Sequence, residues 1–161
     1  MGYRSMKALS ILPYWAMEVL EGYKTVEWRS WKTDYRGTIV ICSSSRKTHR
    51  CIAGHALCLA DIVNIVPFKR KHLKDAEMDE MPDVPCYAWI LDNVRPIVPV
   101  PVKGKLHLWE YDGKIELLDE KKFKTKKEED EFWDWYDSLY YLSPRGLKYE
   151  KEHPELFEDE T

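Results

Sequence analysis

The sequence predicts an α+β fold with a β-barrel core of five to six strands, an early helix and a C-terminal helical extension. The length of 161 residues suits one domain, and 44% hydrophobic with 33% charged residues suits a packed core. Glycine and proline divide the β-rich segments into short or bent strands. Too few helical segments lie between the strands for the crossovers of a parallel sheet, which favours a closed or partly closed barrel.

A strand followed by a helix is predicted at the start of the chain. Residues 7–12 (KALSIL) alternate as in a short strand. Pro13 suits the first turn of a helix, and Gly22 stands where helices often end in a left-handed residue. Between them, apolar side chains recur at helical spacing, namely Trp15, Ala16, Val19 and Leu20.

Four more segments have strand-like patterns, and one is rich in proline. Residues 38–42 (TIVIC) are apolar on both faces, which is typical of a buried strand. Further strands are predicted for residues 51–68, 86–94 and 105–111, the first of them bent near Gly54. Residues 95–104 have proline at every second or third position, so we expect an edge, a bulge or an extended crossing there.

The pattern changes after residue 112, which divides the chain into a barrel domain at 1–112 and an extension at 113–161. Thr125 and Glu128 have the spacing of a capping box and predict a helix over about 125–142. Its apolar stripe predicts packing on the barrel and consists of Phe132, Trp133, Tyr136, Leu139 and Tyr140. The last twelve residues carry six acids and are expected to form a solvated acidic tail.

Composition and charge limit the classes of function. No apolar run approaches the roughly 18 residues of a membrane span, and the N-terminus lacks a secretion signal, so we expect a cytoplasmic protein with no membrane partner. The net charge of −3 conceals a basic segment, because residues 22–50 hold seven Lys or Arg and two acids. Such a segment suits a phosphate-bearing partner.

The cysteines indicate reduced thiols and no metal. Cys42, Cys51, Cys58 and Cys86 include no Cys-x-x-Cys pair, which is a poor spacing for zinc even with histidines nearby. Cys58 lies within an apolar strand, where cysteine usually acts as a small hydrophobic residue. We therefore expect neither a metal nor another cofactor.

The strand at residues 25–31 (TVEWRSW) carries the most distinctive motif. Its alternation directs Val26 and Trp28 inward and places on the opposite face Thr25, Glu27, Arg29 and Trp31. Together with Gly22 and Lys24 this forms the pattern G-x-K-T-x-E-x-R. A paired ammonium and carboxylate in a cleft could bind a polar planar ligand or perform acid–base catalysis, whereas on the surface they would be an ordinary ion pair.

A polar, basic loop follows the next strand and is expected at the barrel rim beside this motif. Its cations are Arg46, Lys47 and Arg50, and its hydroxyls, which could donate hydrogen bonds to a ligand, include Ser43 and Ser44. Basic side chains over an aromatic pocket suit single-stranded nucleic acid, although a solvated loop would have the same composition. Trp31 is the better stacking candidate, while the core is expected to contain Trp28, Trp89 and Trp109.

The residues of this motif resemble the signature of ASCH domains, members of the PUA-like barrel superfamily. The resemblance begins in ALSILPYWAMEVLEGYKTVEWRSW, continues in YRGTIVICSS and ends in YAWILDNVRPIVPVPVKGKLHLWEY, so it covers roughly residues 7–111. Lys103 and Gly104 fall in the turn between its closing strands. The resemblance implies a PUA-like β-barrel and a cleft that binds RNA or other nucleic acid; related PUA-like domains read modified bases.

The resemblance leaves more than one function open. Some small ASCH proteins are amidohydrolases acting on N4-acylated cytidine, with a motif lysine as base, a motif threonine as nucleophile and an assisting glutamate. Lys24 matches that lysine, but Glu27 stands at the threonine's position and would have to activate a water. Glu77 and Glu80 are candidates by position for the assisting glutamate. A third alternative is a protein-interaction adaptor that uses the aromatic C-terminal helix, in a chain that is a monomer or weak dimer.

Overall fold

The computed structural model describes residues 5–157, which form a six-stranded sheet and three α-helices. The last residues of the predicted acidic tail lie outside the described part of the chain. The strands are β1 (Met6–Ile11), β2 (Val26–Arg29), β3 (Gly37–Ser43), β4 (His55–Pro67), β5 (Tyr87–Pro101) and β6 (Leu108–Tyr111). The helices are α1 (Pro13–Leu20), α2 (Lys126–Ser138) and α3 (Pro144–Glu152). The predicted α+β class is confirmed.

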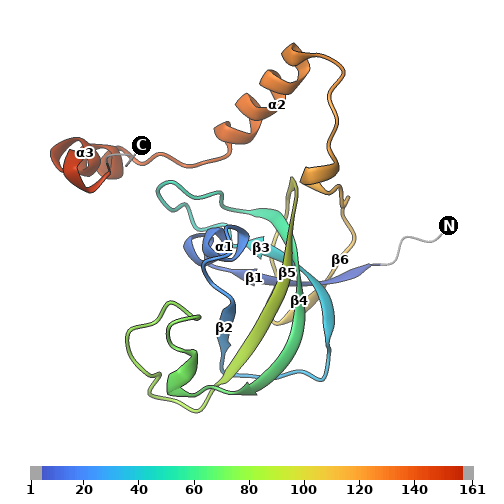
Figure 1. Cartoon of the computed structure of the whole chain (residues 1–161), viewed down its shortest axis with the longest axis vertical. Coiled ribbons are helices and arrows are strands. Elements are labelled where there is room, and N and C mark those ends of the chain that lie inside the picture. Colours follow the sequence, from blue (N-terminus) through green and yellow to red (C-terminus); the bar gives the residue numbers. More distant parts are fainter. Residues whose placement is uncertain (1–4, 158–161) are drawn as a thin grey trace.

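The sheet is strongly curved and has the strand order β2-β5-β4-β3-β1-β6, as Figure 1 shows. β1 and β3 are parallel, with Leu9 opposite Ile41, and the other neighbours are antiparallel. β2 and β6 are the two edges, so the barrel-like sheet remains open. This arrangement is an open version of the predicted barrel.

The long strands bend where the sequence predicts interruptions. Gly54, with φ of +68°, immediately precedes β4, and the pairing of β4 with β5 changes register in three places. The segments at 86–94 and 95–104 form one strand, β5, instead of a strand and a crossing. Only the first part of β5 pairs with β2 on its second side, through residues 87–90. The prolines lie beyond this pairing, where the second side of β5 contacts the chain near Leu117 through an isolated bridge at Ile97.

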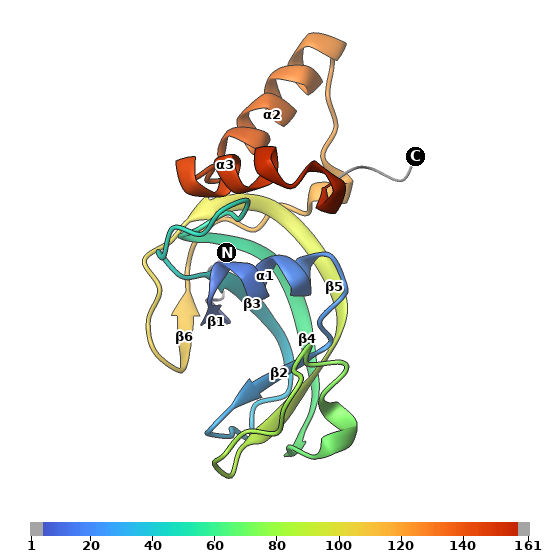
Figure 2. The ribbon, with the colours of Figure 1, turned by 90° about the vertical axis from the view of Figure 1, so that its left-hand side faces the viewer.

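The core lies between α1 and the sheet, and α1 packs against β3, β4 and β5 (Figure 2). Ala16 and Val19 of α1 are fully buried, and so is Trp89 of β5. Burial of apolar surface between a helix and a sheet is the main favourable contribution to folding. This packing also fixes the end of α1, from which the motif segment begins.

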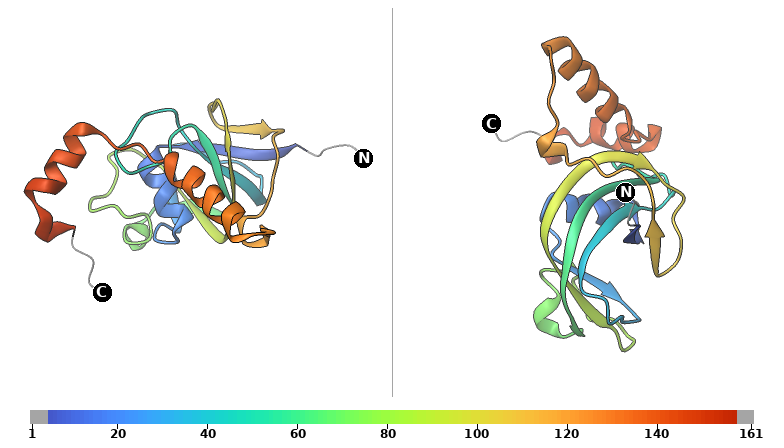
Figure 3. Two further views of the ribbon diagram at one scale, coloured as in Figure 1. Left: turned by 90° about the horizontal axis from the view of Figure 1, so that it is seen from above. Right: turned by 90° about the vertical axis from the view of Figure 1, so that its right-hand side faces the viewer.

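The C-terminal extension contains two helices where the sequence predicted one. Thr125 caps α2 as expected, since its hydroxyl accepts a hydrogen bond from the Glu128 backbone N–H at 3.1 Å. The chain then begins α3, because Ser143 caps it and Pro144 occupies its first position. Both helices lie on the same side of the curved sheet in Figure 3.

The predicted aromatic stripe of α2 docks only in part. Tyr136 is buried, and Phe132 and Tyr140 pack against the core. Trp133 is 39% exposed and packs within the helix against Phe132 and Tyr136, with ring centres 5.1 and 5.4 Å apart. Trp133 therefore belongs to an aromatic cluster on α2 while part of its side chain stays exposed to solvent. Among the described residues, no helix is long and apolar enough to span a membrane.

Candidate ligand-binding site

Lys24 is buried at the junction between α1 and β2. Gly22, with φ of +85°, turns the chain after α1, and the Lys24 backbone N–H donates to the Glu18 carbonyl at 3.1 Å. The side chain is 3% exposed. Its Nζ donates to the Ala76 carbonyl at 2.6 Å and lies 4.7 Å from the centre of the Trp15 ring. The ammonium is therefore held by one carbonyl and one aromatic face.

Glu27 and Arg29 form the next part of the site. Glu27 is 7% exposed, and its Oε1 accepts a hydrogen bond from the Trp28 backbone N–H at 2.8 Å. Its Oε2 lies 3.5 Å from Nη2 of Arg29. The same Nη2 donates to the Ser10 carbonyl of β1 at 3.1 Å. Arg29 thus links the motif strand to the end of β1 and partly balances the Glu27 charge.

These side chains line a cavity of about 450 Å³ that brings Lys24 and Glu27 together. Two aromatic walls are provided by Trp15 and Trp28. The remaining lining residues are Ser10, Ile11, Leu12, Arg29, Ser44 and Met78. The cavity combines a hydrogen-bond donor and a charged acceptor with flat apolar surfaces, which are the features that recognise a polar ring.

A second cavity, of about 580 Å³, adjoins the first. The two cavities share Ser10, Arg29 and Ser44, so they form one continuous cleft. The other lining residues of the second cavity are Ser45, Val102, Lys103, Gly104, Lys105, Leu106 and His107. Its charge comes from Arg29 and the two lysines. The cleft is therefore cationic at one end and has a carboxylate at the other.

Burial and neighbouring charges shift two pKa values beside the first cavity. Burial lowers the pKa of Lys24, and the Arg29 charge adds to this effect, whereas the carboxylates of Glu27, Glu77 and Glu18 oppose it. Burial also raises the pKa of Glu18 to about 7, helped by a hydrogen bond with the Glu77 carboxyl. The loop after β4 therefore supplies a carboxyl group as well as the Ala76 carbonyl that holds Lys24.

Six of the ten predicted ligand-binding residues lie outside both cavity linings in the described structure, and three of these six belong to the strands and the core. Thr25 is exposed, and its backbone N–H donates to Asp75. Ser43 is buried and exchanges hydrogen bonds with the His55 backbone. Trp31 packs edge-on against Trp89, with ring centres 4.8 Å apart. These residues shape the strands and the core around the cleft, while Ser44 lines both cavities.

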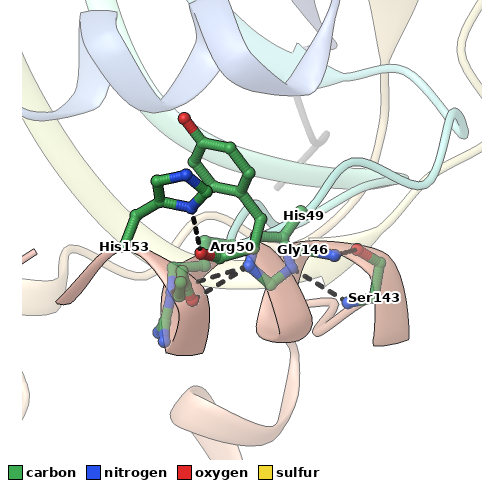
Figure 4. A network of polar contacts seen from close by, with 7 residues as sticks. His49, Arg50, Ser143, Gly146 and His153 are labelled. Carbon is green, nitrogen blue, oxygen red and sulfur yellow. Dashed lines mark hydrogen bonds and ion pairs between the residues drawn. The ribbon is translucent and has the colours of Figure 1, made fainter. Parts of the chain in front are cut away.

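His49 and Arg50 of the predicted basic loop contact the C-terminal extension, as Figure 4 shows. Arg50 Nε donates to both carboxylate oxygens of Glu150, at 2.8 and 2.6 Å, and His49 Nε2 lies 3.1 Å from the same group. These partners lower the pKa of Glu150 to about 2. Lys47 lies over the Tyr141 ring at 5.7 Å. Among the described residues, those lining the two cavities do not include Arg46, Lys47 or Arg50.

Several residues that line the cleft were not predicted from the sequence. Trp15 was assigned only to the apolar stripe of its helix, and Trp28 was expected in the core. Trp28 instead lines the first cavity while its Nε1 donates to Cys86 Sγ at 2.7 Å. Met78 and Lys105 had no local signal, because each enters the cleft through a loop. Candidate Glu80 is exposed.

The cysteines are free thiols in the structure, and three of the four are buried. Burial raises the pKa of Cys42 and of Cys58 to about 12, which disfavours the thiolate that binds metals. Within residues 5–157 no group of three or more His, Cys, Asp or Glu side chains is arranged to hold a metal ion.

Comparisons with known proteins agree with this architecture. A crystal structure of ASCH from Zymomonas mobilis superposes with a TM-score of 0.51, covering 84% of this chain and 96% of that one at 18% identity. A tyrosine-to-phenylalanine mutant of ZmASCH from the same organism gives a TM-score of 0.52, over 81% of this chain and 98% of that one at 17% identity. Identities this low support the fold alone.

A human protein and a family model extend the comparison. Activating signal cointegrator 1 from Homo sapiens is 27% identical over 138 residues, covering 71% of this chain. This chain spans only about a quarter of that protein, since the match covers 24% of its length. The ASCH domain model matches residues 9–155, so the likeness extends beyond the expected end near residue 111 and includes α2 and α3. The chain belongs to the ASCH domain family.

Proposed function

We propose that this ASCH-domain chain binds single-stranded nucleic acid, RNA above all, or a modified base or nucleotide, in the cleft formed by the two cavities. The observation that carries the proposal is the union of Lys24, Glu27 and two tryptophans in one cavity that opens into a cationic one. Nucleobases stack on flat aromatic faces, and their edges offer both donors and acceptors. The phosphates that follow each base are attracted to cations.

The polarity of the cleft suggests how a strand would lie. The first cavity has the size and the aromatic walls for one unstacked base, with the Glu27 carboxylate available to an amine or ring N–H. The second cavity would accept the adjoining backbone beside Lys103 and Lys105. Membership of the ASCH family supports the same cleft, because the family resemblance implies nucleic-acid binding there.

A salt titration with labelled single-stranded RNA tests the proposal. We expect the logarithm of the association constant to fall linearly with the logarithm of salt concentration. Lys103→Ala with Lys105→Ala should weaken binding and flatten this slope, and Glu27→Gln should weaken binding without changing the slope. The matched control is Arg46→Ala with Lys47→Ala, which removes the same charge from the loop outside the two cavities.

Two results would contradict this function. One is the absence of binding at low salt to RNA, single-stranded DNA and nucleotides alike. The other is equal weakening by the control pair and the cleft pair, because this would indicate a diffuse charge effect and no defined cleft.

A second candidate function is amidohydrolysis of N4-acylated cytidine, favoured by the burial of Lys24 beside Glu27. Burial lowers the pKa of Lys24 and so makes the neutral amine, a potential base, more accessible. Glu27 would orient a water, Lys24 would take a proton from it, and the water would attack the acyl carbon. The bond between the acyl carbon and N4 would then break as N4 receives that proton, which releases the carboxylic acid and cytidine. Incubation with N4-acetylcytidine, followed by absorbance, tests this. No turnover, or turnover unchanged in Lys24→Ala, would exclude it.

A further inference from the structure

Two buried polar atoms in the cleft have no hydrogen-bond partner within residues 5–157. They are Nε of Arg29 and Oγ of Ser44. Both residues line both cavities, so the two atoms belong to side chains of the wall where the cavities meet. Buried donors are almost always paired, and each exception needs an explanation. Their position in the cleft favours one explanation, namely that a ligand supplies the missing hydrogen-bond partner.

Neither residue is loosely placed. Arg29 is anchored at its other end, where Nη2 donates to the Ser10 carbonyl at 3.1 Å. The Ser44 backbone is held on both sides, since its N–H donates to Ile11 and its carbonyl accepts from Gly54, each at 2.8 Å. Fixed supports therefore hold both side chains at the wall that the two cavities share, as in a preorganised binding site.

We propose that this wall is an oxyanion subsite, which holds a phosphate group of the nucleic-acid or nucleotide ligand. The inference rests on the proposed function and makes it more specific, because it requires a phosphorylated ligand and fixes its direction. Guanidinium N–H and hydroxyl groups are standard donors to phosphate oxygens. The base then occupies the first cavity and the phosphate the junction.

The charges around the wall favour the same orientation of the ligand, with its base in the first cavity and its phosphate at the junction. Arg29, Lys103 and Lys105 line the second cavity, and none of the described residues lining it is a carboxylate. Glu27 lines the first cavity and would repel an anion placed deeper there. A phosphate is therefore most stable at the wall or on its cationic side.

The shape of the second cavity also depends on how closely the backbone at Gly104 approaches Ser10. A Cβ added at Gly104 would lie 2.5 Å from Oγ of Ser10, the serine shared by both cavities. Ser10 is held there, because its Oγ accepts a hydrogen bond from Trp109 Nε1 at 3.0 Å. A larger residue at this position would therefore displace the Ser10 side chain, whereas glycine lets the chain after β5, with Lys103 and Lys105, pass close to the wall.

Calorimetric titration of nucleosides against their 5′- and 3′-monophosphates tests the subsite. We expect at least one monophosphate to bind about tenfold or more tightly than its nucleoside, the effect of a hydrogen bond to a charged group. Ser44→Ala should lower the ratio of monophosphate affinity to nucleoside affinity toward one, and Arg29→Lys should lower the same ratio. Ser138→Ala, at the end of α2, is the matched control and should change neither affinity.

Inorganic phosphate alone separates this inference from the proposed function. We expect it to raise the Tm of the wild-type protein and not that of Ser44→Ala. If RNA binds but monophosphates show no advantage over nucleosides, or if Ser44→Ala weakens both equally, the subsite is refuted and the function stands. If neither RNA nor nucleotides bind but phosphate stabilises the protein through Ser44, the function fails and the subsite stands.

Discussion

The carboxyl pair of Glu18 and Glu77 makes the stability of this protein depend on pH in an unusual direction. Glu18 has a pKa of about 7 in the folded protein, against an ordinary value of 4.5, because of burial and its hydrogen bond with Glu77. Between these two pH values the folded protein retains a proton that the unfolded chain has lost. Stability therefore falls as pH rises through this window, whereas a typical salt-bridged carboxylate has the opposite effect.

The size of this change in stability follows from the shift in the pKa of Glu18. Each pKa unit corresponds to about 1.36 kcal/mol, so a change from 4.5 to about 7 corresponds to at most ~3 kcal/mol. Glu18 is partly exposed, and solvent screening reduces this figure, so we expect about 1–3 kcal/mol. Glu18→Gln keeps a hydrogen-bonding side chain but cannot ionise, and it should remove this contribution.

Urea unfolding from pH 4.5 to 8.5 measures the effect. The unfolding free energy of Glu18→Gln relative to wild type should be near zero or slightly negative at pH 4.5, rise through the window and level off above pH 7. Glu155→Gln, at an exposed position near the C-terminal end of the described chain, is the matched control and should not show this rise. A flat difference for Glu18→Gln as well would refute the assignment of a shared proton.

Two further predictions concern the C-terminal clamp and the thiols. Gly146→Ala would place a Cβ 2.4 Å from the His49 ring, so we expect a loss of about 1–3 kcal/mol in urea unfolding; an unchanged midpoint would show that α3 shifts freely. In the folded protein a thiol reagent at pH 8 should modify Cys86 first, because burial raises the pKa of Cys42 and Cys58 to about 12. Peptide mapping that finds Cys42 or Cys58 modified before Cys86 would contradict this.

Local patterns predicted the elements that depend on neighbouring residues. Gly22 ends the first helical segment, and the alternation of residues 25–31 predicts β2, because glycine conformation and strand periodicity act over a few residues. The Thr125 cap was equally visible. The second C-terminal helix was missed because Ser143 and Pro144, which can end a helix, also begin α3.

The sequence predicted the motif residues of the candidate site, but it did not predict the residues that surround them. Lys24, Glu27 and Arg29 were expected to face one hollow, and they line the same cavity. Arg50 was expected at the rim, yet it pairs with Glu150, a residue 100 positions away. A basic side chain in a loop has the same local pattern whether it meets a phosphate, a carboxylate or water, so only the folded chain distinguishes these cases.

The sequence by itself determined the family, the α+β class and the order of charged groups in the motif. These features depend on residue type, periodicity and short spacing, which are properties of the linear chain. Only the tertiary structure decided that loops after β4 and β5 would bring Met78, Lys103 and Lys105 to that motif, and that Arg29 and Ser44 would keep unpaired donors within the described residues. Contacts between distant segments depend on how the whole chain packs, and patterns of neighbouring residues do not specify that packing.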